Sequence, residues 1–333
     1  MRAPLLAALM FAVANAGCVS LDILSLGPDG PPEQSVVAGV AGPKVLLLEI
    51  DGVISGTDMP SFLGPSAPSV VSRVRTVLDL ARQDPEIQGV LLRIDSPGGT
   101  ATASEQVYTE ILRFKKERRI PVVAQLLTTA ASGGYYIAMA ADEVQAHPTT
   151  VVGSIGVIFT SVNVAGLMEK LGIEDQTITG GEFKDIGSPF RPLTGEERAQ
   201  LQSIVDDLHA RFREIVDRGR PQLDAEQVAS LANGRIYSAP QALENGLVDR
   251  IGAMGDAIGL LSDRMGAPNV RVVAYHSPNR PRSNIYMQAP GAVLPPGASI
   301  PSLDPAAMGQ ALAPILGRPG FHYLWWPGLG GLR

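Results

Sequence analysis

Continuous apolar runs alternate along the chain with stretches of helical apolar spacing. The runs at 45–50, 89–94 and 121–126 predict buried strands, because a strand that is covered on both faces has few polar positions. The stretches between and after them predict amphipathic helices at 69–83, 102–117 and 133–141. Strands and helices that alternate at this spacing predict an α/β fold with a parallel sheet and helical crossovers.

The same kind of pattern extends the predicted domain to residue 276. A helix is predicted near 163–171, a long amphipathic helix over 194–218, and a last strand at 270–274. We therefore expect one catalytic domain over 44–276, with flexible extensions at both ends.

The chain beyond this domain is rich in proline and glycine and has no sustained period. This composition predicts a mostly disordered tail over 277–333. The aromatic end of the tail, 321–326, could touch a membrane or a partner, but we expect a loosely packed terminus.

The first residues have the features of a secretory signal. Residues 1–17 carry Arg2, a short apolar run and then small residues, and the run is too short to span a bilayer. The small residues before Cys18 resemble a lipobox, which favours a lipoprotein acylated at Cys18. Residues 18–43 would then form a flexible, lipid-anchored tether. The alternative is ordinary cleavage after Ala16, which would release an exported protein without a lipid.

Composition excludes several classes of protein. The 333 residues carry a formal net charge of -6, which argues against a nucleic-acid partner. One cysteine excludes a disulfide within the chain and any cysteine-rich metal site. We expect neither a metal nor a cofactor, because the four histidines lie too far apart in the sequence to form a ligand pattern: His147, His209, His276 and His322.

Two segments at predicted strand-to-helix junctions could support acyl chemistry. The glycines of 95–99 would let the backbone turn sharply and present N–H groups to an oxyanion, although a simple tight turn has the same composition. Ser132 lies among very small residues just before a helix, so it is either a nucleophile with a reachable hydroxyl or a helix N-cap.

A nucleophilic serine needs a base, and no histidine makes a good case for that role. A lysine can replace it if the amine is kept neutral. Lys184 lies in a glycine-rich loop between apolar residues, but most such lysines are ordinary surface residues. Its neighbour Asp185 would oppose a lowered lysine pKa unless the carboxylate points away.

Five motifs together resemble the signal peptide peptidase A (SppA) family. They are Ser-Pro-Gly-Gly at 96–99, Ala-Ser-Gly-Gly-Tyr-Tyr at 131–136, Gly-Ser-Ile-Gly-Val at 153–157, Phe-Lys-Asp-Ile-Gly-Ser-Pro-Phe-Arg at 183–191, and the segment 234–249. The likeness covers about 45–275, in the order that the family has. It implies a serine protease with a Ser-Lys dyad and a Clp-protease/crotonase-like fold.

The resemblance also implies a role for each matching residue. Ser132 matches the nucleophile, Lys184 the general base, and Ser154 the serine that hydrogen-bonds the lysine. Gly99 and Gly133 match the expected donors of the oxyanion hole. Each motif occurs once, as in the short members of the family. In those members the serine and lysine of one active site come from neighbouring protomers of a ring. The resemblance therefore implies a homo-oligomeric ring, such as an octamer.

The expected function is that of a serine endopeptidase in the cell envelope. The family cleaves signal-peptide remnants or other extended apolar peptides, and the chain would act on the extracytoplasmic or periplasmic side through its lipid anchor. Two alternatives have the same fold: a catalytically inactive envelope scaffold, and an acyl-CoA enzyme of the crotonase type. The presence of both Ser132 and Lys184 argues against an inactive scaffold. The same pair, together with the export signal, argues against an acyl-CoA enzyme.

Overall fold

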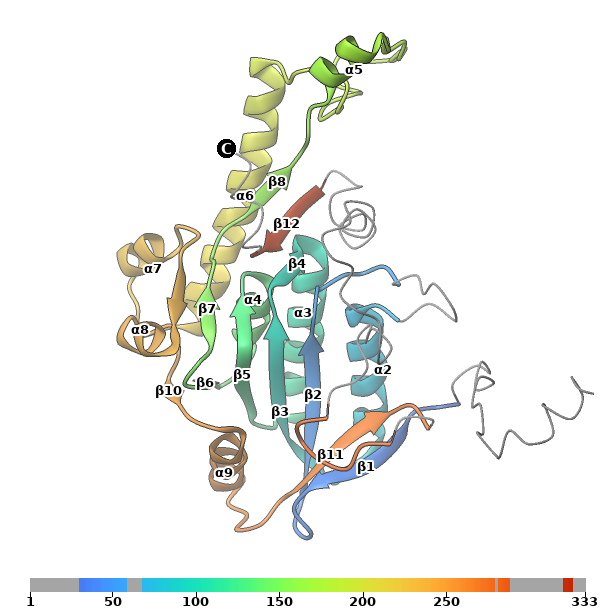
Figure 1. Cartoon of the computed structure of the whole chain (residues 1–333). Coiled ribbons are helices and arrows are strands. Elements are labelled where there is room, and N and C mark those ends of the chain that lie inside the picture. Colours follow the sequence, from blue (N-terminus) through green and yellow to red (C-terminus); the bar gives the residue numbers. More distant parts are fainter. Residues whose placement is uncertain (1–29, 59–67, 279–280, 288–319, 326–333) are drawn as a thin grey trace, which may run out of the picture.

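The three predicted buried strands form the centre of a nine-stranded sheet (Figure 1). The computed structural model describes residues 30–58, 68–278, 281–287 and 320–325. Within the sheet, β2 pairs in parallel with β3, and β3 pairs in parallel with β5. The prediction of an α/β fold with parallel strands is therefore confirmed. The strands are β2 (Lys44–Asp51), β3 (Ile87–Ser96) and β5 (Val122–Ala131).

Shorter strands extend the sheet on both sides of this centre. The strand order is β1-β11-β2-β3-β5-β6-β10, and β7 joins β5 to β9 beside this path. All pairs are parallel except β1 with β11 and β7 with β9. These strands are β1 (Glu33–Ala38), β6 (Glu143–Ala146), β7 (Val151–Gly153), β9 (Ile236–Ser238), β10 (Arg250–Ile251) and β11 (Arg271–His276).

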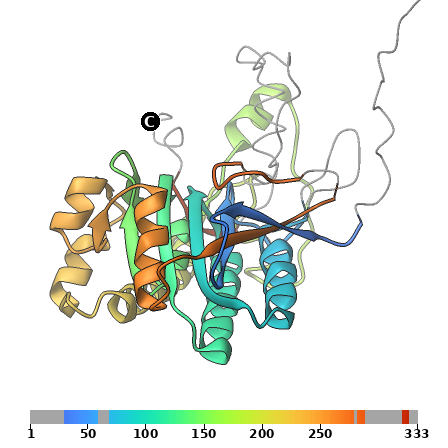
Figure 2. The ribbon, with the colours of Figure 1, turned by 90° about the horizontal axis from the view of Figure 1, so that it is seen from below.

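Helices cover both faces of the sheet because successive strand residues point to opposite sides. Leu46, Leu48 and Ile50 belong to the core that includes buried residues of α2, α3 and α4, whereas Val45 and Leu47 belong to the core that includes α9. Figure 2 shows α2 and α3 side by side. The helices are α2 (Val70–Gln83), α3 (Ala101–Arg118), α4 (Gly133–Ala138) and α9 (Met254–Arg264).

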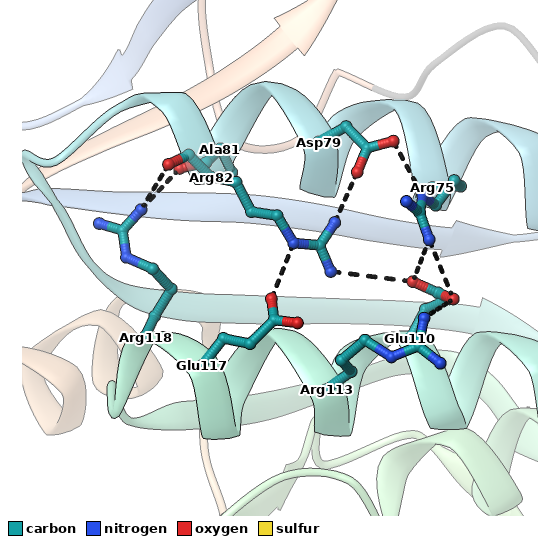
Figure 3. A network of polar contacts seen from close by, with 8 residues as sticks. All are labelled: Arg75, Asp79, Ala81, Arg82, Glu110, Arg113, Glu117 and Arg118. Carbon is teal, nitrogen blue, oxygen red and sulfur yellow. Dashed lines mark hydrogen bonds and ion pairs between the residues drawn. The ribbon is translucent and has the colours of Figure 1, made fainter.

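Charged side chains bridge the outer surfaces of α2 and α3 (Figure 3). Arg75 pairs with Glu110 at 3.1 Å, and Arg82 pairs with Glu117 at 2.9 Å. Arg118 of α3 also donates to the carbonyl oxygens of Ala81 and Arg82, which end α2. Exposed ion pairs of this kind each contribute little to stability. The buried apolar residues between α2 and α3 therefore hold the two helices together, and the ion pairs align the helices.

The second half of the chain extends beyond the sheet. The segment between β8 (Ile158–Thr160) and α6 (Gly195–Gly219) projects past the sheet with α5 (Ala165–Leu171) (Figure 1). A capping box of Thr194 with Glu197 starts α6, which returns to the domain. Two short helices, α7 (Ala225–Leu231) and α8 (Ala239–Glu244), follow it.

The predicted flexible extensions need correction in two places. Within the expected tether 18–43, residues 33–38 form β1, which pairs with β11. Within the expected disordered tail 277–333, Arg282 is buried against Glu49, and residues 320–324 form β12 (Gly320–Leu324) in the middle of a three-stranded sheet with β4 (Gly98–Thr100) and β8. The pairing partners of both strands lie far away in the sequence, which is why local composition did not reveal them.

The predicted signal sequence 1–17 and Cys18, the predicted lipid acceptor, lie outside the described residues, as does most of the tail. Within the part that the structure describes, no helix combines the length and apolarity needed to cross a bilayer. The same part contains no group of three or more histidine, cysteine, aspartate or glutamate side chains that could hold a metal ion.

Candidate active site

Ser132 occupies a strained turn between β5 and α4. Its φ of 52° lies in the left-handed region, which residues other than glycine seldom adopt. It holds the N-cap position of α4, but its side chain accepts no capping hydrogen bond. The hydroxyl oxygen is buried and has no hydrogen-bond partner among the described residues. The N-cap explanation therefore lacks the bond that would support it.

Ser154 directly follows β7, the strand that pairs with β5 beside Ser132. Strands β5 and β7 are parallel, and Ala131 pairs with Gly153, so the two serines follow paired residues at the same edge of the sheet. The Ser132 N–H donates to the Gly153 carbonyl oxygen at 2.8 Å. Ser154 is also buried and also has a positive φ, of 50°. The fold thus brings together two residues separated by 22 positions in the chain.

One of the two glycines predicted to donate to an oxyanion, Gly133, approaches Gly98, the residue before the other predicted donor. Gly99 lies in β4, directly after the turn from β3, and Gly133 is the first residue of α4. A Cβ atom built on Gly98 would lie 2.8 Å from the Gly133 nitrogen, and one on Gly133 would lie 3.2 Å from the Gly98 Cα. Side chains at either position would push the two segments apart, so glycine is what allows this close approach.

Lys184 does not contact Ser132 in the protomer. It is exposed, and it lies in the segment between α5 and α6, which projects past the sheet (Figure 1). Within the described ranges it forms no ion pair. The structure therefore brings Ser132, Ser154 and Gly133 together, places Gly99 one residue beyond the Gly98–Gly133 contact, and leaves the predicted base apart.

Arg191 holds the carboxylate beside Lys184. Its Nε and one terminal nitrogen donate to the two Asp185 oxygens at 2.7 and 2.8 Å, and it also binds Glu197 of α6. These hydrogen bonds hold the pKa of the Asp185 carboxyl below its ordinary value and lower that of Glu197 to about 2. The motif alone does not show whether the Asp185 carboxylate faces the lysine. That carboxylate is in fact bound by Arg191, a role that the motif alone did not reveal.

Aromatic side chains lie beneath the turn that carries Ser132. The Tyr135 hydroxyl donates to the Leu247 carbonyl oxygen at 2.6 Å, and burial raises the pKa of Tyr135 to about 12. Tyr136 is hydrogen-bonded to Glu105, and burial together with this bond raises its pKa well above the ordinary value. Arg211 of α6 binds the same carboxylate at 2.8 Å. These contacts tie α4 to α3 and α6 and so fix the serine turn.

Strand β12 borders this turn. The sequence pattern did not predict this strand. His322, which was expected at or beyond the edge of the domain, pairs with Thr100 and Ile158, and burial lowers its pKa. The one signal in the sequence was the aromatic cluster at 321–326, which we expected to pack loosely.

Comparisons with known proteins identify the family. The model of peptidase family S49 matches residues 114–267. A signal peptide peptidase SppA of Enterococcus faecium is 35% identical over 262 residues, which are 79% of this chain and 75% of the relative. A protease of Synechocystis is 39% identical over 215 residues, which are 64% of this chain and 72% of the relative.

The chain also aligns with a solved structure at low similarity. That structure is a mutant of a membrane-bound stomatin-specific protease in complex with a substrate peptide, with a TM-score of 0.45 and 18% identity, over 71% of this chain and 93% of that chain. The parallel sheet with helical crossovers agrees with the Clp-protease/crotonase-like fold that the resemblance implied. By its identity to these relatives over most of their length, the chain belongs to peptidase family S49, the family of SppA serine proteases.

Proposed function

We propose that the protein is a serine endopeptidase in which Ser132 is the nucleophile and Lys184 the general base. The observation that carries this proposal is the Ser132 hydroxyl, which is buried without a hydrogen-bond partner in a strained turn. An unsatisfied buried hydroxyl costs about 1–3 kcal/mol, and strained backbone adds to that cost, so a purely structural role gives no reason to keep both.

In the proposed mechanism the serine attacks a peptide carbonyl. Neutral Lys184 removes the Ser132 proton as the oxygen bonds to the carbonyl carbon, and the N–H groups of Gly99 and Gly133 stabilise the oxyanion. Lys184, oriented by Ser154, then passes the proton to the leaving amine. The same lysine activates the water that hydrolyses the acyl-enzyme, which regenerates the serine.

The lysine in each site would come from a neighbouring protomer of a homo-oligomeric ring. The projecting segment that carries Lys184 exposes large apolar side chains, and Ile178 is 98% exposed in the protomer. A concentration of exposed apolar residues marks an interaction surface. The residues are Val162, Leu167, Leu171, Ile173, Ile178, Phe183 and Phe190. Their burial between protomers would also remove water from around the lysine amine, which favours the neutral form that a base requires.

The proposed substrates are signal-peptide remnants or other extended apolar peptides in the cell envelope. A relative that is similar over most of its length is named as a signal peptide peptidase. The export features of residues 1–17 and the lipid-acceptor Cys18 would place the domain on the extracytoplasmic side of a membrane.

A serine-reactive phosphonate tests the proposal directly. We expect the probe to label the wild-type protein at Ser132, and a peptide library to be cut only by protein that has not been labelled. Mass spectrometry of the labelled peptide locates the modified residue. Labelling at another serine, or cleavage that persists after complete labelling, would contradict the assignment.

Arg191→Ala tests how the lysine is kept neutral. The substitution releases the Asp185 carboxylate, and a free carboxylate beside Lys184 would favour the charged amine. Because the neutral amine is the proposed base, the pH profile of kcat/KM should move to higher pH, with about a tenfold loss at pH 7.

Arg198→Ala is the matched control for this experiment. Arg198 is an exposed arginine of α6 that forms no ion pair within the part of the chain that the structure describes. The control removes the same charge and should leave the pH profile in place. A profile that shifts equally in both variants, or in neither, would exclude the positioning role of Arg191.

A further inference from the structure

Ser96 is a fully buried serine just before the turn that leads to Gly99, one of the two proposed oxyanion donors. It is the last residue of β3. Its hydroxyl donates to the Gly52 carbonyl oxygen at 2.6 Å and accepts the Gly98 N–H at 3.0 Å. Because Gly52 directly follows β2, this one hydroxyl ties together the backbone segments that follow two neighbouring strands.

The segment after β2 also sets the direction of the Gly99 N–H. The Ile54 N–H donates to the Gly98 carbonyl oxygen at 2.8 Å, and the Thr100 N–H donates to the Ile54 carbonyl oxygen at 2.9 Å. Successive backbone groups of an extended chain point to opposite edges, so the Gly99 N–H points away from Ile54. The Ser96 hydroxyl binds the same segment and the same turn, so it helps to hold this arrangement.

Ser96 also contacts the backbone that carries the second proposed donor, Gly133. It pairs with Ala130 of β5, and the next residue of α4, Gly134, packs directly against it. A Cβ atom built on Gly134 would lie 2.8 Å from the Ser96 carbonyl oxygen and 3.4 Å from the Ser96 Cβ. Ser96 therefore contacts both segments that carry the donors, from a position buried beneath them.

We infer that Ser96 is a positioning residue for the oxyanion hole: its hydroxyl holds the turn that presents the Gly99 N–H beside Gly133. It acts through the backbone and does not touch the substrate. An oxyanion donor is effective only within about 3 Å of the developing charge, so a small displacement of the turn weakens it. The inference rests on the proposed function, since the donors have this role only if Ser132 is the nucleophile.

Ser96→Ala tests the positioning role by a split between rate and binding. The substitution leaves the Gly98 N–H and the Gly52 carbonyl without their partner, which lets the turn shift. We expect kcat to fall at least about tenfold while KM stays within about twofold, because the lost interaction belongs to the transition state. The loss should stay below the hundred- to thousandfold, roughly, that removal of a whole donor costs.

Two further measurements separate this role from a general loss of structure. The rate constant for labelling of Ser132 by the phosphonate should fall by about the same factor as kcat, because the phosphonyl oxygen uses the same donors. In chains that carry Ser132→Ala, the affinity for an uncut peptide should be the same with and without Ser96→Ala. A general defect in the fold would instead weaken the peptide complex as well.

Thr150→Val is the matched control. Thr150 is a buried residue whose hydroxyl donates to the Leu126 carbonyl oxygen at 3.1 Å, away from the glycine turn. The substitution removes one buried hydroxyl and its hydrogen bond to the backbone, with little change of shape. It should lower the Tm and leave kcat and the labelling rate unchanged.

Ser96→Cys carries the test if the alanine variant does not fold. A thiol fills the same space and forms weaker hydrogen bonds, so kcat and the labelling rate should lie below the wild-type values. Wild-type rates in the folded variant, or equal losses in kcat and peptide affinity, would overturn the inference. If the wild type is labelled at Ser132 and the Ser96 variant is labelled equally fast, only the positioning role fails. If the wild type is not labelled at Ser132, the catalytic assignment itself fails.

Discussion

Replacing Ser132 with alanine is expected to lower kcat/KM by at least about ten-thousandfold, because the nucleophile is lost and not merely weakened. The fold should not suffer. The hydroxyl has no hydrogen-bond partner among the described residues, so its removal relieves an unsatisfied polar group. We expect an unchanged or higher Tm, with an unchanged oligomeric state. Steady-state cleavage of a peptide substrate and thermal unfolding measure the two effects.

Ser69→Ala is a control that should lower stability and leave activity unchanged, the opposite of the result expected for Ser132→Ala. Ser69 is a buried serine that caps α2, where its side chain accepts the Ser72 N–H at 3.2 Å. Losing this cap should cost about 1 kcal/mol of stability and leave kcat/KM unchanged. A Ser132→Ala protein that keeps most of its activity, or that loses activity only because it unfolds, would refute the nucleophile assignment.

The sheet was predictable because its central strands carry their own signal. The apolar runs at 45–50, 89–94 and 121–126 became β2, β3 and β5, with ends that differ by a few residues. The long helix predicted at 194–218 became α6. A strand that is buried on both faces, or a helix that is buried on one, has a characteristic spacing of apolar residues in its own sequence. These elements could therefore be predicted without knowing their distant partners.

Strands that depend on distant partners were not predictable in this way. Strand β1 has polar residues at one end and pairs with β11, about 240 positions later. Strand β12 packs against Tyr136 and Phe212, which the fold brings together from separate helices. Neither strand has an apolar run or alternation strong enough to outweigh the glycines and prolines around it.

The candidate site was likewise predictable only where local sequence is sufficient. The motif around Ser132 left the choice between nucleophile and N-cap open, and only the geometry shows that the capping bond is missing. The role of Arg191 depends on Glu197 lying opposite Asp185, which requires the turn into α6 to be formed. If Lys184 acts across a subunit boundary, as proposed, its partner serine belongs to another chain and the contacts within one protomer do not include it.

Lys184→Ala should lower kcat/KM by about a thousandfold or more, because the proposed base is lost and no side chain of the described residues is hydrogen-bonded to the Ser132 hydroxyl to replace it. Lys170→Ala, which removes an exposed lysine of α5 in the same projecting segment, should leave the rate unchanged. The pair separates the loss of a base from the loss of a surface charge.

Co-expression of Lys184→Ala and Ser132→Ala chains, each with its own tag, tests where the two residues meet. If each site takes its serine from one protomer and its lysine from the next, random mixed rings should regain activity in about one site in four, since each site needs one partner of either kind. Purification through both tags isolates the mixed rings, and rings of either variant alone should stay inactive. Mixed rings as inactive as their parents would mean that serine and lysine act within one chain. In that case the projecting segment would have to fold back onto β5 and α4, bringing Lys184 to the serine of its own protomer.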